Sequence, residues 1–234
     1  MQHLTFATSL AVTSHVPSIL TSLQVSVVTT VSTTALLLTC FPLITTIGKI
    51  PPSALQDVQV LTPMRRNLLG AENLNAVIQA RLNGTGPAVM RGGMSFRAGD
   101  RVMQLRNNYD KDVYNGDIGF VQSVVPETRS LVVLFDGRPV EYASGDLDEL
   151  VLAYATTIHK SQGSEYPAVI VLMHRQHYMM LQRNLLYTAI TRGKKLVLVI
   201  GAPWAVKTAI ETNTVRERRT TLAEKMQERA GESE

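Results

Sequence analysis

Two segments of similar design decide how this chain folds. Residues Tyr154–Tyr166 read YATTIHKSQGSEY, and the apolar, β-rich run Ala168–Met173 follows them directly. Residues Asn184–Lys195 read NLLYTAITRGKK and lead into a second apolar run, Leu196–Ile200. Each segment places hydroxyl and charged groups on a turn or helix next to a core strand, and such groups suit a site that handles phosphates. The repeated arrangement predicts an α/β domain with a phosphate-handling site.

A resemblance to a known family rests on these residues. TIHKSQGSEY (157–166) resembles motif V, and YTAITRGK (187–194) resembles motif VI, of superfamily 1 DNA helicases. The particular residues of both motifs resemble those of the RecD-like branch, with its UvrD-like helicase C-terminal domain. Over roughly residues 50–220, the resemblance implies a RecA-like parallel-sheet lobe interrupted by a small SH3-like β-barrel. It also implies a cytoplasmic 5′-to-3′ motor that uses ATP and Mg²⁺ and binds single-stranded DNA.

The resemblance assigns roles within the first segment. Thr157 and His159 are expected to face the DNA backbone, whereas Gly163 and Glu165 are expected on the nucleotide side. Gly163 would let the chain turn tightly, and the Glu165 carboxylate would accept hydrogen bonds from ribose hydroxyls. Hydroxyls and backbone N–H groups at a helix start are natural phosphate binders, which agrees with this assignment.

The second segment is expected to supply the catalytic arginine. The apolar spacing predicts a helix over Leu181–Arg192, with Gly193 as its C-cap. By resemblance, Arg192 is the arginine finger that contacts the γ-phosphate, and such arginines contribute about 10³–10⁵ in rate. The alternative is an arginine that complements the helix C-terminus, worth about 0.3–1 kcal/mol. Arg183, at the other end of the helix, is a second candidate.

An earlier block completes the expected nucleotide site. Asp57–Thr62 predicts a buried strand, and the apolar face of Ala71–Leu82 predicts a helix that ends at Asn83-Gly84. The sequence VQVLTPMRR between them resembles motif IV, in which a basic side chain reaches the ATP phosphates. Arg65 and Arg66 are both candidates, and the sequence does not distinguish them. The alternative is that both are solvated loop arginines.

Short strands with turn residues between them predict the inserted barrel over residues 96–150. Val151–Ala155 is expected to return the chain to the parallel sheet. Arg101 and Tyr114 are predicted to contact DNA by charge and stacking, although a structural role for the tyrosine is equally open. The expected barrel strands are Arg101–Leu105, Ile118–Val125, Leu131–Phe135 and Val140–Tyr142.

The sequence contains no G-x-x-x-x-G-K-[ST] phosphate loop. Asp148-Glu149 does not follow an apolar strand, so we interpret it as a loop or strand edge and not as a Mg²⁺-binding pair. No spacing of His, Cys and carboxylates predicts a metal site, and His174 and His177 are expected in a solvated turn. We therefore expect the C-terminal motor lobe of the helicase, inactive in ATP hydrolysis without a Walker-motif-bearing RecA-like lobe as its partner. The alternative is a non-catalytic single-stranded-DNA-binding or regulatory fragment.

Residues 1–48 contain no Asp, Glu, Lys or Arg and are rich in Ser, Thr and β-branched residues. Three interpretations stay open for this segment: sequence foreign to the family, a disordered or β-rich extension, and a membrane segment, which the frequent Ser and Thr disfavour. The expected organisation is residues 1–48 unassigned, 49–95 and 151–212 as the RecA-like lobe, 96–150 as the insertion, and 213–234 as a charged tail. The single Cys40 excludes an internal disulfide, and the net charge of +4 permits nucleic-acid contact.

Overall fold

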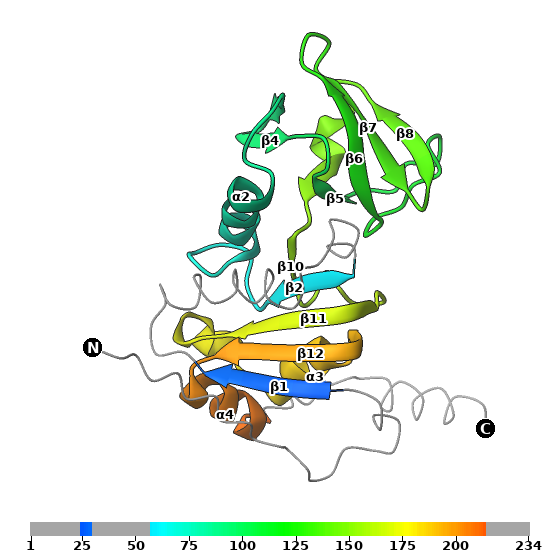
Figure 1. The fold of residues 1–234 in the computed structure, drawn as a ribbon. Helices are drawn as coiled ribbons and strands as arrows, with labels where there is room; N and C mark the ends of the chain where they lie inside the picture. Colours follow the sequence, from blue (N-terminus) through cyan, green and yellow to red (C-terminus); the bar gives the residue numbers. More distant parts are fainter. Residues whose placement is uncertain (1–23, 30–56, 214–234) are drawn as a thin grey trace, which may run out of the picture.

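The computed structural model describes residues 24–29 and 57–213 (Figure 1). The described residues form two five-stranded sheets, one parallel and one antiparallel, and a two-stranded hairpin that precedes the antiparallel sheet in sequence. Figure 1 shows the antiparallel sheet beyond the β2–β10 edge of the parallel sheet, with helix α2 beside it.

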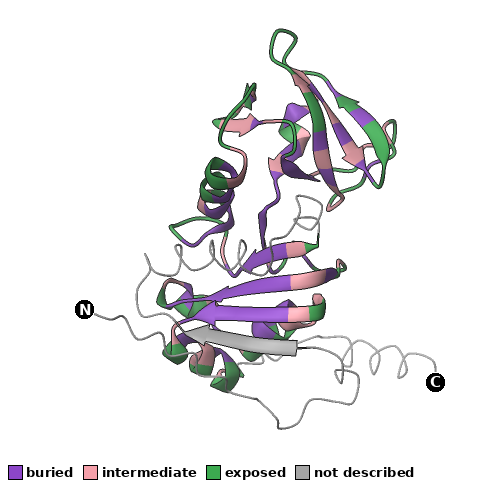
Figure 2. Cartoon of the chain, in the orientation of Figure 1, coloured by how far each residue is buried: buried purple, intermediate pink, exposed green. Residues whose placement is uncertain are grey.

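The parallel sheet has the strand order β1-β12-β11-β2-β10, and all its pairings are parallel. Its central strands are buried along most of their length, as expected for a sheet covered on both faces (Figure 2). Val60, Ile170 and Leu198 are register partners across the three central strands. The bounds are β1 Gln24–Thr29, β2 Val58–Thr62, β10 Ala155–Thr157, β11 Tyr166–Met173 and β12 Gly193–Gly201.

Different helices cover the two faces of the parallel sheet. Along β11, Ile170 and Leu172 pack in the core that includes Leu74 and Ile78 of α2 (Ala71–Leu82). The alternate residues of β11 and β12 pack in a second core with the helices that follow them. Those helices are η4 Arg175–Met180, α3 Arg183–Ile190 and α4 Pro203–Glu211.

The insertion forms an antiparallel sheet in the order β8-β7-β6-β5-β9. Its inner residues belong to the same hydrophobic core as α2 and one face of the parallel sheet, so the two sheets are packed together. The short helix η3, Asp146–Glu149, precedes the last strand. The bounds of the hairpin and the sheet are β3 Val89–Arg91, β4 Met94–Phe96, β5 Arg101–Gln104, β6 Ile118–Val125, β7 Ser130–Phe135, β8 Arg138–Tyr142 and β9 Leu150–Leu152.

The helix predicted over Ala71–Leu82 is confirmed, and the predicted strands of the insertion are confirmed within two residues. Two local predictions are wrong. Leu150–Leu152 pairs with β5 in the antiparallel sheet, and the parallel sheet resumes only at Ala155. Gly193 begins β12 instead of capping α3, whose C-cap is Thr191. A Cβ at Gly193 would overlap a methyl group of Val197, so close packing explains this glycine.

Six residues of the charge-free segment lie in the parallel sheet, where β1 pairs with β12 along its full length. The rest of residues 1–48, and the tail from residue 214 onward, lie outside the described residues. In the described parts of the chain, every helix is too short or too polar to cross a membrane.

Candidate functional site

The carboxyl ends of β2 and β10 bring two loops together. The Ile158 N–H donates to the Thr62 carbonyl at 3.0 Å, which joins the start of one loop to the end of the neighbouring strand. The buried Thr62 hydroxyl donates to the Leu69 carbonyl at 2.6 Å and folds the other loop back on its own strand. A Cβ at Gly70 would overlap the Arg66 carbonyl, so the turn into α2 requires glycine. Ligands of open α/β sheets bind at this edge.

Exposed polar and basic groups lie on these loops. Thr157, half-buried, accepts at its hydroxyl from the Lys160 N–H at 3.4 Å, and His159 and Lys160 are exposed. Partial burial and the nearby charge of Arg65 lower the pKa of Lys160. Arg65 itself pairs with Glu72 at 2.6 Å on the surface. The structure therefore places Thr157 and His159, which are predicted to contact DNA, on the same loop as Lys160, a residue near Arg65 that the sequence alone did not single out.

Arg192 lies at the opposite end of the strands, against the turn before β11. Its Nη1 donates to the Ser164 carbonyl at 3.0 Å, and its Nε donates to the Thr188 carbonyl at 3.2 Å. Its Nη2 donates to the Thr191 hydroxyl at 3.3 Å. The guanidinium is partly buried, and these three partners are neutral, so they orient the side chain without neutralising its charge.

The adjacent turn holds the other two predicted nucleotide residues. Gly163 has φ +87°, a left-handed conformation that favours glycine, and a Cβ there would meet nothing within 4 Å. The tight turn expected at Gly163 is therefore confirmed, and backbone conformation alone explains it. Glu165 is exposed and pairs with Lys194 at 3.1 Å. The Tyr166 N–H donates to the Arg192 carbonyl at 2.8 Å, which fixes this turn beside the end of α3.

The residues predicted to bind the nucleotide thus lie at two opposite ends of the strands of one sheet, the carboxyl edge and the amino edge. Arg65 and Arg66 follow the carboxyl end of β2, whereas Arg192 precedes the amino end of β12, and these strands run parallel on either side of β11. Gly163 and Glu165 lie with Arg192. Arg183 begins α3 on the carboxyl side and donates from Nε to the Ile210 carbonyl at 2.7 Å.

Arg101, predicted to contact DNA, is only 3% exposed. Its Nη1 donates to the Val58 carbonyl at 2.7 Å, and the guanidinium lies 6.0 Å and 5.8 Å from the ring centroids of Phe120 and Tyr166. Desolvation lowers its pKa to about 10. The prediction of a DNA contact is wrong for this residue, because a side chain enclosed between the two sheets has no surface to offer a phosphate.

Tyr114, by contrast, is on the surface of the barrel. It is 44% exposed and packs edge-to-face with Tyr109, which is 76% exposed, at a centroid separation of 6.1 Å. Its hydroxyl donates to Asp112 at 2.9 Å, and this hydrogen bond is the main cause of the raised pKa of Tyr114. Lys111 of the same loop instead pairs with Asp146 at 2.7 Å. The loop presents two ordered aromatic rings to solvent.

The two histidines expected in a solvated turn are buried, so that expectation is wrong. The His174 N–H donates to His177 Nδ1 at 3.2 Å, and the Gln176 N–H donates to His174 Nδ1 at 3.3 Å. Together they cap η4. Burial, and secondarily the neighbouring His174, lowers the pKa of His177 to about 4. Across residues 24–29 and 57–213, no cluster of His, Cys and carboxylates could hold a metal ion.

The acidic pair Asp148-Glu149 belongs to η3 of the barrel. Asp148 accepts two hydrogen bonds of 2.6 Å from Arg91 in the hairpin. Glu149 accepts from Gln104 at 2.8 Å and from Asn108 at 3.2 Å. Glu149 therefore serves contacts within the insertion, and Asp148 ties the insertion to the β3–β4 hairpin.

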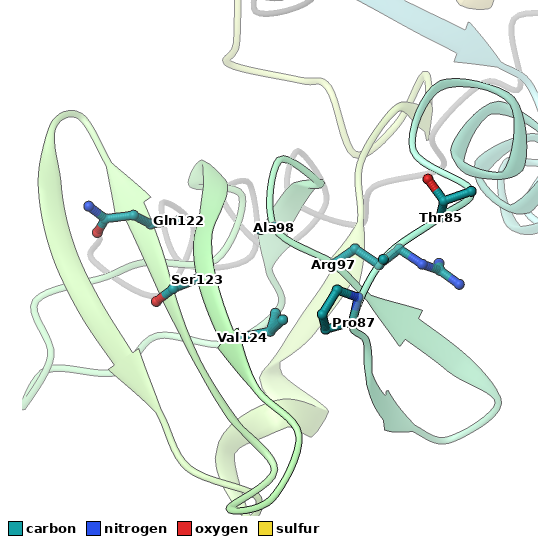
Figure 3. Close-up of a pocket in the computed structure, with 8 residues that line it drawn as sticks. Thr85, Pro87, Arg97, Ala98, Gln122, Ser123 and Val124 are labelled. Carbon is teal, nitrogen blue, oxygen red and sulfur yellow. The ribbon is translucent and has the colours of Figure 1, made fainter.

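A groove of about 290 Å³ lies between the loop after α2 and strand β6 (Figure 3). Arg97 is the one charged residue of its lining, and its Nη1 donates to the Ser95 hydroxyl at 2.7 Å. None of the predicted site residues lines it. The lining comes from the loop after α2, the turn before β5 and the middle of β6: Thr85, Gly86, Pro87, Arg97, Ala98, Gln122, Ser123 and Val124.

Two family matches fall on the described residues. Residues 74–135 match the ATP-dependent RecD-like DNA helicase SH3 domain, and residues 152–200 match the UvrD-like helicase C-terminal domain. The chain is 39% identical over 171 residues to the ATP-dependent RecD2 DNA helicase of Deinococcus radiodurans, covering 72% of this chain and 23% of that protein. It is 40% identical over 119 residues to the RecBCD enzyme subunit RecD of Mycobacterium tuberculosis, covering 51% and 20%.

The chain thus spans about a quarter or less of the length of these two relatives. Among solved structures, Bacteroides Pif1 bound to single-stranded DNA matches with 22% identity and a TM-score of 0.48, over 75% of this chain and 45% of that one.

Proposed function

Because this chain carries the SH3 domain of RecD-like DNA helicases and, after it, a UvrD-like helicase C-terminal domain, we propose that it forms the C-terminal motor lobe of an ATP-dependent 5′-to-3′ DNA helicase. The observation that carries the proposal is the arrangement of its motifs on one parallel sheet. Motif V begins at the carboxyl edge beside basic loops, and motif VI ends at the amino edge with an oriented arginine.

Single-stranded DNA is assigned to the carboxyl edge and the barrel loop. Thr157, His159 and Lys160 offer a hydroxyl, an imidazole and an ammonium group to the phosphate backbone. Tyr109 and Tyr114 offer exposed rings on which bases can stack, an interaction worth about 1–3 kcal/mol per base. Backbone charge contacts and aromatic stacking together are the usual means of holding a single strand without sequence preference.

The nucleotide is assigned to the turn and arginine of the amino edge. The Arg192 guanidinium, held by carbonyl and hydroxyl groups, keeps its positive charge for a γ-phosphate that approaches the Gly163–Glu165 turn. When bound, ATP with Mg²⁺ would supply the phosphoryl group whose charge this arginine stabilises. A Walker-bearing lobe would hold the phosphates and the metal, since these 234 residues contain no G-x-x-x-x-G-K-[ST] phosphate loop.

The motif IV arginines pose an alternative within this proposal. Arg65 and Arg66 share the carboxyl edge with Arg183, so phosphate contacts there would involve these arginines and not Arg192. The two arrangements differ in which substitution slows ATP hydrolysis. They also differ in whether the same substitution weakens DNA binding.

The test combines the chain with a Walker-bearing lobe of a RecD-like helicase and measures DNA-stimulated ATP hydrolysis. Arg192→Ala should lower the turnover about 10³-fold or more while DNA affinity is kept. Arg65→Ala should weaken DNA binding, and Lys207→Ala, on the outer surface of α4, is the matched control for loss of a cation. Equal turnover of the Arg192→Ala protein and the control would refute the assignment of Arg192 as an arginine finger. ATP hydrolysis by the 234-residue chain alone, abolished by Arg192→Ala, would refute the need for a second lobe.

A second candidate function is a single-stranded-DNA-binding module without catalysis. It is favoured by the absence of a phosphate loop from these 234 residues, which contain all the proposed DNA contacts. In that case the affinity for a single-stranded oligonucleotide would fall steeply with salt and would not respond to ATP in the presence of a Walker-bearing lobe.

A further inference from the structure

Asp100 is a fully buried carboxylate with four hydrogen-bond donors. Its Oδ2 accepts from Gln79 Nε2 at 2.6 Å and from the Arg97 N–H at 2.7 Å. Its Oδ1 accepts from Asn83 Nδ2 at 2.7 Å and from the Tyr154 hydroxyl at 2.8 Å. A buried charge is tolerated only when such donors replace water. The four donors come from α2 and its C-cap residue Asn83, from the turn that leads into the barrel, and from the segment that leads out of it.

Asn75 of α2 is a second node and holds both sheets with one side chain. Its Nδ2 donates at 2.9 Å to the carbonyl of Leu152, the last residue of β9 in the barrel. The same Nδ2 donates at 2.9 Å to the carbonyl of Ala155, the first residue of β10, and the Ala155 N–H donates back to Oδ1 at 2.8 Å. Asn75 therefore forms hydrogen bonds on both sides of the two-residue crossing between the sheets, Ala153-Tyr154.

The parallel sheet also forms hydrogen bonds to the crossing. The buried Gln59 donates from Nε2 to the carbonyls of Ala153 and Tyr154, both at 3.3 Å. In the other direction, Arg101 of β5 donates to the Val58 carbonyl at 2.7 Å, and its own carbonyl accepts from the Ala153 N–H at 2.8 Å. These contacts run in both directions across the boundary.

We infer that Asp100 and Asn75 are positioning residues that lock the barrel and the parallel sheet into one rigid unit. A domain inserted through two covalent links can swing only if those links separate or twist. Here the incoming link at Arg97 and the outgoing link at Tyr154 are tied to the same carboxylate. The barrel loop that bears Tyr114 therefore keeps a fixed place relative to Thr157 at the end of β10. That this geometry holds a DNA strand rests on the proposed function, but the rigidity itself does not.

The test measures the separation of two spin labels on the full chain by pulsed electron resonance, without DNA or nucleotide. Labels are placed on cysteines introduced at Glu127, in the β6–β7 turn, and at Lys207, on α4, after Cys40→Ser removes the native thiol. The labelled protein with no further substitution should give one narrow distance distribution. Asn75→Ala combined with Tyr154→Phe should broaden it, because the side-chain hydrogen bonds that tie residues 152–155 to α2 and to Asp100 are lost.

Asn73→Ala is the matched control, since Asn73 is also on α2 but donates to Leu68 at 2.8 Å on the surface. It should keep the narrow distribution. A broad distribution in the wild type, or a folded double variant as narrow as the control, would overturn the inference.

Hydrogen exchange on Asn75→Ala alone covers the case in which the double variant does not fold. The Ala155 amide, which loses its acceptor, should exchange about tenfold faster, while the amides of β6 and β7 should keep their rates. An equal acceleration throughout the chain would mean that Asn75 only stabilises the fold, which would also overturn the inference. Neither measurement involves DNA or ATP, so failure here and failure of the proposed function are distinguishable.

Discussion

Mild acid should destabilise this protein through His177. The imidazole is fully buried in η4, where its Nδ1 accepts from the His174 N–H. Burial lowers its pKa from 6.5 to about 4, a change that corresponds to about 3 kcal/mol. The unfolded chain therefore binds a proton at a pH where the native protein does not, and the free energy of unfolding must fall as the pH falls below 6.5.

The loss should develop across the window between the two pKa values. It should amount to about 1.4 kcal/mol at roughly pH 5.5 and approach its full value near pH 4. Burial lowers the pKa of His174 as well, so that residue adds to the loss in the same direction. The carboxylates Asp146 and Asp148, whose pKa values are lowered by Lys111 and Arg91, act only below their ordinary value of 3.8 and lie outside the window.

Urea denaturation at a series of pH values measures this effect. His177→Asn can keep an acceptor for the His174 N–H, but it removes the titrating ring, so its stability should depend less on pH between 6.5 and 4. The reasoning fails if wild type and variant show the same pH dependence, or if the wild type is equally stable across the window.

Three further substitutions test the packing around the sites. Asn75→Ala removes three buried hydrogen bonds and should lower the free energy of unfolding by about 3 kcal/mol in urea denaturation. The surface change Asn73→Ala should lower it by well under 1 kcal/mol. Similar losses for the two variants would contradict the role of Asn75 in joining the two sheets. Gly163→Ala should cost about 1 kcal/mol in thermal unfolding because φ is +87°, and Gly145→Ala, with open space and a negative φ, should be nearly neutral; equal stability of the two would exclude backbone strain at the turn. Gly119→Ala should cost roughly 1–3 kcal/mol in the same assay, since a Cβ would lie 2.6 Å from a side chain of β7, and an unchanged melting temperature would show that the barrel can yield there.

The local pattern of apolar and turn residues was sufficient to predict some of the helices and strands. The apolar face of Ala71–Leu82 predicted α2 to the residue, and the short apolar run Leu131–Phe135, bounded by turn residues, predicted β7 within one residue. Pattern was insufficient at Val151–Ala155, because a short apolar run fits either sheet. The pairing of Leu152 with Val102 decided that part of the run in favour of the barrel.

The same contrast applies to the site. The sequence alone determined the family motifs, the tight turn at Gly163 and most of the places where strands end, because these depend on residues close together in the chain. Only the tertiary structure decided that Arg101 is enclosed between two sheets. It also decided that Arg65 and Arg192 lie at opposite ends of the strands. Exposure and distance depend on which remote segments pack together, and in this chain the order of strands in the parallel sheet differs from their order in the sequence.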